Sequence, residues 1–142
     1  MKITVICKSK AKRGLIESIA QLYIHTLKLE NSRYELVIST VTDLAKTANM
    51  RGGIIQIGDK ILSIALDSKL NGEKLFETLA HEMVHAKQYA KGQLTTYNKR
   101  NGEVGFKWMG KTKNYKYFDS PWEIEAYSKE KLLTNKILEL LG

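Results

Sequence analysis

The stretch LAHEMVHA at residues 79–86 places His81 and His85 four residues apart, with Glu82 directly after the first histidine. A helix turns by about 100° per residue, so the two imidazoles lie about 40° apart and one turn apart along the axis. Both can therefore reach one metal ion. Glu82 lies about 100° from His81 on the same wheel. That offset suits a carboxylate that reaches a water molecule at the metal without binding the metal itself.

Residues 73–90 contain neither glycine nor proline, and their periodicity predicts a helix. The apolar residues form one arc nearly opposite the histidines. They are Leu75, Phe76, Leu79, Met83, Ala86 and Ala90. Two histidines at this spacing can also be structural or surface residues. Glu82, the position of the histidines outside the apolar arc, and an acidic residue downstream together favour a metal site.

Length and composition predict one domain spanning residues 1–142, with 43% hydrophobic and 27% charged residues. No apolar run reaches the length of a membrane span, and the N-terminus lacks the features of a signal peptide. We therefore expect a cytoplasmic protein without a membrane partner. The single cysteine, Cys7, excludes an internal disulfide and an all-cysteine zinc site. Its place at the end of an apolar segment predicts a buried thiol.

The first half of the chain predicts strand, helix, strand, strand, strand, helix. The ranges are residues 2–7, 12–29, 34–41, 54–57, 61–66 and 73–90. The helix should return the chain so that the second strand lies beside the first, and Gly58-Asp59 should connect a hairpin. A short helical turn within residues 43–53 would end at Gly52-Gly53. Asn71 is a candidate N-cap of the site helix, and His25 is expected to be structural or exposed.

The second half predicts a β-hairpin of residues 103–109 and 114–118, followed by a helix over residues 122–141. Pro121 stands at a first-turn position, where no backbone donor is needed. The small sheet, the helix packed on it, the site helix, the inserted hairpin and the last helix together indicate the α+β class.

The third metal ligand is sought in the last helix, because a catalytic zinc site commonly has three protein ligands. Glu123 and Glu125 lie about 200° apart on a helix, so they cannot both face one metal. Acidic residues in a first helical turn can also simply offset the helix dipole. We favour Glu123 as the ligand and the dipole role for Glu125.

The net charge is +8, but 19 lysines stand against 4 arginines and are scattered along the chain. Lysine contributes unspecific phosphate attraction or solubility, so this pattern favours a solvated basic surface over specific nucleic-acid binding. Residues 97–118 interleave basic and aromatic side chains, which also suits stacking on single-stranded nucleic acid. The wall of a substrate cleft needs aromatic rings too. Nucleic acid is therefore an alternative partner that we do not favour.

The motif His81-Glu82-Met83-Val84-His85 with Glu123-Ile124-Glu125-Ala126 resembles the gluzincin branch of zinc metallopeptidases. It is most similar to small single-domain minigluzincins and to SprT-like proteins. SprT proteins proper use a third histidine, and this chain has none after His85, so that similarity concerns the fold. The resemblance implies a zincin-like fold, Zn²⁺ held by His81, His85 and Glu123, and residues 61–66 as an edge strand that pairs with an extended substrate.

The chemistry expected from these residues is peptide-bond hydrolysis by a metal-activated water, with Glu82 as general base. Tyr115, Tyr117 and Tyr127 are candidates for stabilising the oxyanion, and the sequence does not choose among them. We expect a zinc metallopeptidase, an endopeptidase acting on peptides or proteins. The alternative is a basic, nucleic-acid-associated zinc-binding protein or a DNA-linked protease. A structural zinc site has no need of the non-ligand carboxylate of Glu82.

Overall fold

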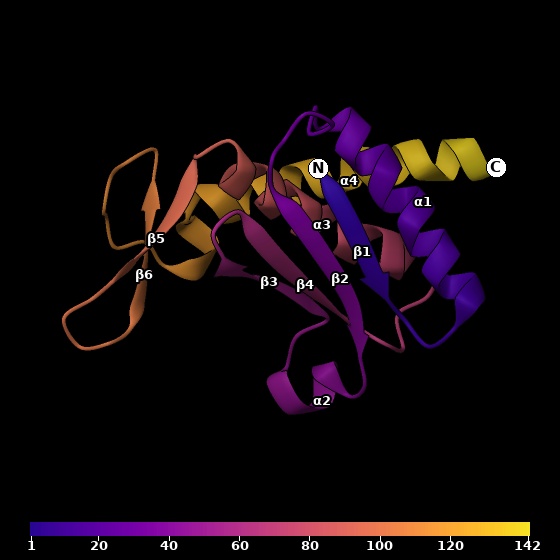
Figure 1. The fold of residues 1–142 in the computed structure, drawn as a ribbon, viewed down its shortest axis with the longest axis horizontal. Helices are drawn as coiled ribbons and strands as arrows, with labels where there is room; N and C mark the ends of the chain where they lie inside the picture. Colours follow the sequence, from indigo (N-terminus) through magenta and orange to yellow (C-terminus); the bar gives the residue numbers. More distant parts are fainter.

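The computed structural model describes residues 1–142 as a mixed α+β fold with a four-stranded sheet, a two-stranded sheet and four α-helices (Figure 1). In chain order the elements are β1 (Lys2–Ile6), α1 (Lys10–Thr26), β2 (Glu35–Val41), α2 (Leu44–Ala48), β3 (Gly52–Gly58), β4 (Ile61–Asp67), α3 (Gly72–Ala90), β5 (Leu94–Asn98), β6 (Val104–Trp108), the 3-10 helix η1 (Tyr117–Asp119) and α4 (Pro121–Leu141). The predicted α+β class and order of elements in the first half are confirmed.

The larger sheet has the strand order β1-β2-β4-β3. β1 and β2 are parallel, with Val5 opposite Ile38, so the first helix does return the chain beside the first strand. β2 and β4 are also parallel, whereas β3 and β4 form the predicted antiparallel hairpin. β3 begins at Gly52 rather than after Gly53.

The expectation that residues 61–66 form an edge strand is wrong. β4 lies inside the sheet, with β2 on one side and β3 on the other, so the edge strands are β1 and β3. Burial explains this order, because Leu62, Ile64 and Leu66 of β4 are fully buried, whereas Ile55 and Ile57 of β3 are exposed. Apolar surface is removed from water most completely on an interior strand.

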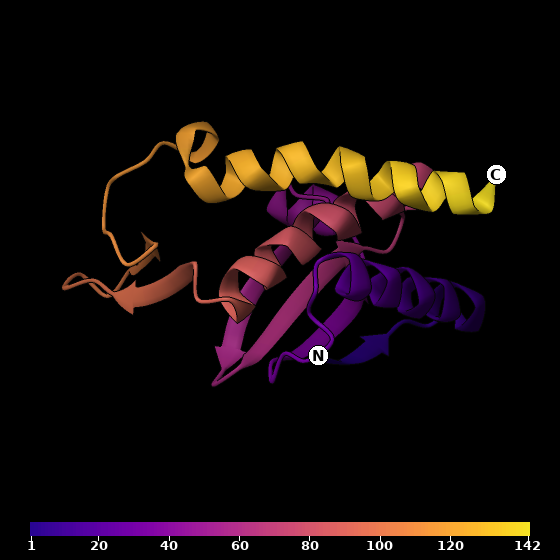
Figure 2. The same cartoon turned by 90° about the horizontal axis from the view of Figure 1, so that it is seen from above.

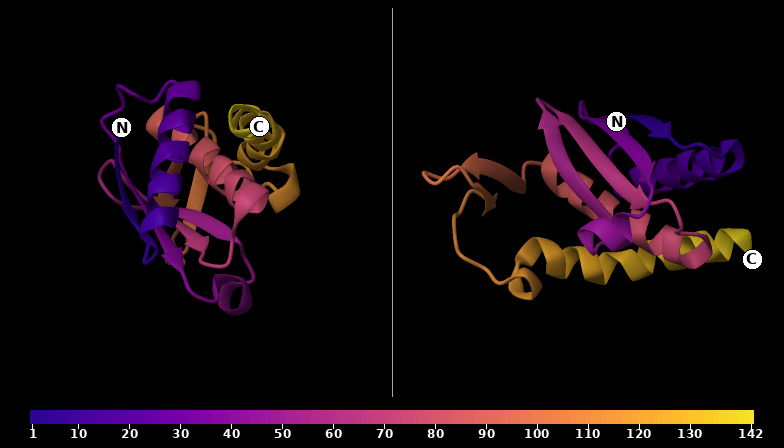
Figure 3. Two further views of the ribbon diagram at one scale, coloured as in Figure 1. Left: turned by 90° about the vertical axis from the view of Figure 1, so that its right-hand side faces the viewer. Right: turned by 90° about the horizontal axis from the view of Figure 1, so that it is seen from below.

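Three layers build the body of the protein (Figures 2 and 3). Helices α1 and α3 pack on the same face of the sheet, and α4 packs on the side of α3 that faces away from the sheet. The predicted apolar arc of α3 forms the contact with the sheet, where Leu79 and Met83 are fully buried. The opposite side of α3, which carries the histidines, therefore faces α4.

Helix α1 ends three residues before the predicted boundary. Lys28 adopts a left-handed φ of 59°, and the N–H groups of Lys28 and Leu29 donate to the carbonyls of His25 and Ile24. This is the Schellman arrangement, in which an apolar residue after the helix packs back onto the last turn. Leu29 is buried for that reason, although its apolar character extends the helical pattern in the sequence.

The predicted second hairpin is right in its first strand, which is β6, and wrong in its second. β6 pairs with β5, not with residues 114–118, which contain no strand. Tyr97 of β5 stands opposite Gly105 of β6, and a Cβ at Gly105 would come within 2.6 Å of the Tyr97 ring. Glycine therefore lets the ring lie across the neighbouring strand. The hairpin extends away from the larger sheet (Figure 1).

Three smaller predictions have clear outcomes. Cys7 is buried, as predicted. The His25 side chain is 80% exposed and lies 3.3 Å from the Glu30 carboxylate, so it is an exposed residue. Asn71 does occupy the N-cap position of α3, but its side chain caps no helical N–H and donates to the carbonyl of Lys69.

No helix of the fold combines the length and apolar character that crossing a membrane requires.

Asp67 at the end of β4 holds α2 in place, because its carboxylate accepts hydrogen bonds from the backbone N–H groups of Lys69 and Ala45 at 2.9 and 2.7 Å. These bonds lower the pKa of Asp67 below its ordinary value. Its ionised form therefore stabilises the fold above the unfolded-state pKa of about 3.9, and this contribution disappears as pH falls through the folded-state pKa.

We expect Asp67→Asn to lower the free energy of unfolding at pH 7, and the difference from the unsubstituted protein to shrink as pH falls below about 4. Urea unfolding along a pH series measures this difference. Asp59→Asn is the matched control, because Asp59 lies in an exposed turn and should change little. A difference that stays constant with pH would contradict the role of the Asp67 charge.

Candidate metal centre

His81 and His85 lie on the face of α3 that α4 covers, and their ring centroids are 4.9 Å apart. The helical spacing predicted from the sequence therefore brings both imidazoles to one side. His85 is 5% exposed, while His81 borders a cleft and is partly exposed. One imidazole is therefore buried and the other lies at the boundary with solvent.

Glu123 in the first turn of α4 completes the cluster. Its Oε1 atom lies 2.9 Å from His81 Nε2 and 3.1 Å from His85 Nε2, and the three side chains can offer ligand atoms within 4.8 Å of one another. The structure thus brings together the three residues predicted as ligands. Such a cluster of two imidazoles and one carboxylate could hold a metal ion.

The charge state of Glu123 suits this arrangement. Its burial alone would raise the pKa, but hydrogen bonds from His81 and His85 outweigh burial and lower the pKa of Glu123 to about 2. The group is therefore an ionised carboxylate at neutral pH. An ionised carboxylate can bind a cation without first losing a proton.

Glu82 lies beside the cluster but is not part of it. The side chain is 5% exposed, and its Oε2 atom is buried without a hydrogen-bond partner. Burial raises the pKa of Glu82, although the neighbouring histidines act in the opposite direction. Because Glu82 also lines the cleft, a carboxylate of raised basicity lies in the cleft wall beside His81.

Gln88 positions His85 and was not identified from the sequence. It is fully buried, and its Oε1 lies 2.8 Å from Nδ1 of His85. Its Nε2 donates to the carbonyl of Trp122 and to Glu125 Oε1, both at 2.9 Å. Because an amide oxygen can only accept, Nδ1 of His85 donates a hydrogen to Gln88, and Nε2 is the ring nitrogen that faces Glu123. The spacing of three residues after His85 is the one sequence signal that could have pointed to it.

Glu125 points away from the cluster and belongs to the support of Gln88. Both of its carboxylate oxygens accept hydrogen bonds from Lys87 Nζ at 2.9 Å, and Lys129 lies 3.1 Å away. These bonds and the one from Gln88 lower the pKa of Glu125 to about 2, against the effect of burial. Glu125 therefore does more than offset the helix dipole, because it ties α4 to α3 two residues beyond Glu123.

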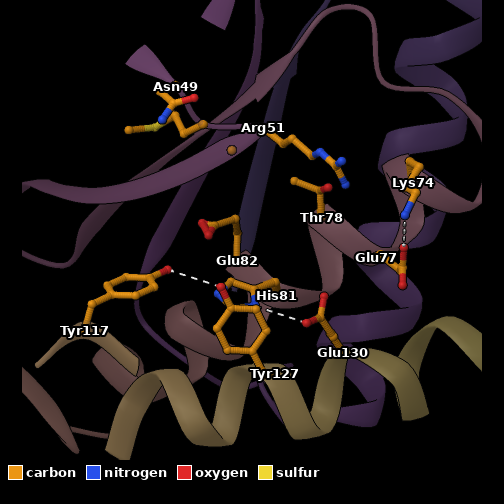
Figure 4. Close-up of a pocket in the computed structure, with 12 residues that line it drawn as sticks. Asn49, Arg51, Lys74, Glu77, Thr78, His81, Glu82, Tyr117, Tyr127 and Glu130 are labelled. Atoms are coloured by element: carbon orange, nitrogen blue, oxygen red, sulfur yellow. Dashed lines mark hydrogen bonds and ion pairs between the residues drawn. The ribbon is translucent and has the colours of Figure 1, made fainter. Parts of the chain in front are cut away.

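A cleft of about 440 Å³ opens beside His81 and Glu82 (Figure 4). Tyr117 and Tyr127 line it with their hydroxyl oxygens 3.5 Å apart, and the Tyr127 ring packs on His81 at 4.6 Å between centroids. Tyr115 does not line the cleft. Glu130, one of the residues that sequence reasoning missed, lies two turns after Glu123 on α4 and 3.6 Å from Nδ1 of His81.

The aromatic residues of the hairpin segment pack on Trp122 in the first turn of α4. The centroids of the Phe106, Tyr115 and Trp108 rings lie 5.7, 5.7 and 6.3 Å from that of Trp122. None of these rings lines the cleft. They join the hairpin to the helix that carries Glu123.

No protein-family model, no curated protein and no solved structure gives a significant match to this chain. The chemistry of the cluster therefore rests on its own residues and their geometry.

We expect Gln88→Met to weaken zinc binding by about 10- to 100-fold, because loss of an outer hydrogen bond to a ligating histidine typically has this effect. Competition with a chelator of known affinity measures the change. Gln21→Met, at an exposed position on α1, is the control. Unchanged zinc affinity in a folded Gln88→Met protein would show that His85 is oriented without Gln88.

Glu123→Ala should abolish tight zinc binding, whereas Glu125→Ala should weaken it much less, because only Glu123 lies within reach of both imidazoles. Zinc titration of both variants, with circular dichroism to verify folding, makes the comparison. If the Glu125 variant lost zinc and the Glu123 variant kept it, the ligand role would pass to Glu125.

Proposed function

We propose that this protein is a zinc-dependent peptidase with a zincin-like fold of the gluzincin type. The observation that carries the proposal is the convergence of His81, His85 and Glu123 beside Glu82, a buried carboxylate with an unpaired oxygen. The placement of the site helix between the sheet and α4 supports the same conclusion.

The donor set supports zinc as the metal. Two imidazoles and one carboxylate are the ligands of a catalytic zinc site that leaves a position for water. Ligand bonds of about 2.1 Å at tetrahedral angles would separate the ligand atoms by about 3.4 Å. The observed 2.9 and 3.1 Å between Glu123 and the two histidines need only a small expansion. A bound zinc ion would polarise the substrate carbonyl and make water more acidic.

Glu82 would carry the protons of the reaction. Its unpaired Oε2 would take one proton from the attacking water as the new C–O bond forms, and would then give that proton to the amine nitrogen as the C–N bond breaks. The raised pKa of Glu82 suits both steps, because the group must accept and release a proton near neutral pH.

Tyr117 or Tyr127 would stabilise the oxyanion. Tyr117 and Tyr127 line the cleft, whereas Tyr115 packs against Trp122 outside it. A tyrosine hydroxyl, with an ordinary pKa of about 10, keeps its proton at neutral pH and can donate a hydrogen bond. Either hydroxyl could take this role.

The substrate would be an extended peptide along β3. This strand is at the edge of the sheet, and its first residue, Gly52, borders the cleft. A Cβ on Gly52 would lie 2.8 Å from the Thr78 side chain, so glycine lets the edge strand approach the site helix closely. Free backbone groups on such an edge can pair with an added strand. Cleavage within a chain fits this mode of binding.

Glu82→Gln should lower peptide hydrolysis by at least about 100-fold while zinc stays bound, because the change removes the base and keeps all three ligands. Zinc content and cleavage of a fluorogenic peptide library measure the two properties. Glu73→Gln, in the exposed first turn of the same helix, is the control. Loss of zinc in Glu82→Gln would make Glu82 a ligand. Absence of stoichiometric zinc in the purified, zinc-supplied protein would overturn the proposal.

A further inference from the structure

We propose that Arg51 forms an anion-binding subsite in the cleft, which selects substrates with a carboxylate on the C-terminal side of the cleaved bond. The selection rests on the proposed peptidase function, whereas binding of the carboxylate can be measured without it. The carboxylate belongs either to an acidic side chain or to the end of the peptide.

Arg51 stands on a fixed part of the backbone. It lies directly before β3, and its carbonyl accepts a hydrogen bond of 2.8 Å from the N–H of Asp67 at the end of β4. The adjacent Gly52 packs against Thr78 of α3. The backbone is therefore held between the sheet and the site helix, while the side chain extends along the cleft toward Thr78 and Lys74 (Figure 4).

The guanidinium of Arg51 has no partner, whereas Lys74 and Glu130, which line the same cleft, each have one. Lys74 lies 3.6 Å from Glu77, and Glu130 lies 3.6 Å from His81. Arg51 forms no ion pair with either acid and donates no side-chain hydrogen bond, although it lines the same cleft. A planar guanidinium presents two parallel N–H donors that match a carboxylate. Its charge therefore remains available to a ligand.

The direction of β3 decides which side of the substrate meets Arg51. β3 starts beside Arg51 and runs away from it. A peptide added to this edge in the antiparallel sense, which is the more frequent and more stable pairing, runs in the opposite direction. Its C-terminal part then lies next to Arg51. An acidic residue there, or the terminal carboxylate of a short peptide, would reach the guanidinium.

The test uses the full, zinc-loaded chain and matched quenched peptides. One set carries glutamate or glutamine on the C-terminal side of the cleaved bond, a second carries them on the N-terminal side, and a third ends in a free carboxylate or an amide. The kcat/KM ratio of each charged peptide to its neutral counterpart is measured for the unsubstituted protein, Arg51→Ala, Arg51→Glu and the control Arg100→Ala. Arg100 is exposed in the β5–β6 turn, outside the cleft.

We expect a ratio of about 10 for a carboxylate on the C-terminal side, because charge-assisted hydrogen bonds discriminate by at least this factor. The ratio should fall to about 1 in Arg51→Ala and below 1 in Arg51→Glu, and stay unchanged in Arg100→Ala. Preference among side-chain peptides or among free-terminus peptides identifies the source of the carboxylate. An unchanged ratio in Arg51→Ala, or preference for an acid on the N-terminal side, overturns the proposal.

A binding measurement separates this inference from the proposed function. Fluorescence anisotropy with zinc-loaded Glu82→Gln protein compares the affinity of the glutamate and glutamine peptides, with and without Arg51→Ala added. If no peptide is cleaved by any variant, the peptidase function fails. The Arg51 subsite then stands if the glutamate peptide binds about tenfold more tightly only when Arg51 is present, and falls if both peptides bind equally.

Discussion

The contact of one Glu123 carboxylate with two imidazoles is the interaction on which the candidate metal centre between α3 and α4 depends. Its Oε1 atom lies within about 3 Å of both Nε2 atoms, in a region that is largely closed to water. Buried ionised groups cost free energy unless each has partners. Here the two imidazole partners belong to α3 and the carboxylate belongs to α4. A metal ion at this point would replace a hydrogen-bonded contact by stronger bonds, and would connect metal binding to the stability of the helix pair.

The site helix and the common face of its two histidines are predictable because local rules decide them. The spacing of His81 and His85 fixes their common face, and Gly92 marks the end of α3 with a φ of 70°. The end of α1 was not predictable in the same way. There Lys28 takes the left-handed conformation, and a lysine gives no signal for it. The sequence shows only that Glu123 and Glu125 face different sides of the last helix. In the structure Glu123 contacts the two histidines, whereas Glu125 contacts Lys87 and Gln88.

The pairing of distant strands and the contacts of buried polar side chains could not be predicted from the sequence. β3 is at the edge because β4, and not β3, pairs with β2. Both strands are apolar, so the sequence does not show which of them lies next to β2. The sequence does not identify the hairpin partner of β6, because residues 94–98 and 114–118 both contain residues suited to strands. The link from Gln88 to His85 joins two polar residues of the same helix. This link orients the Gln88 amide only because α4 supplies the two acceptors of its Nε2 group, the carbonyl of Trp122 and the carboxylate of Glu125.

Glu123 and His85 are in contact although they are 38 residues apart in the sequence, and Trp122 helps to hold them together. Closing so long a loop onto one atom has an entropy cost, and a flexible segment would leave the ligand poorly placed. The rings of Phe106, Trp108 and Tyr115 pack on the Trp122 ring, and its carbonyl accepts a hydrogen bond from Gln88. One residue therefore joins the hairpin to α4 on one side and to the support of His85 on the other. The inserted hairpin thereby helps to fix Glu123, the candidate ligand that follows Trp122 in the chain.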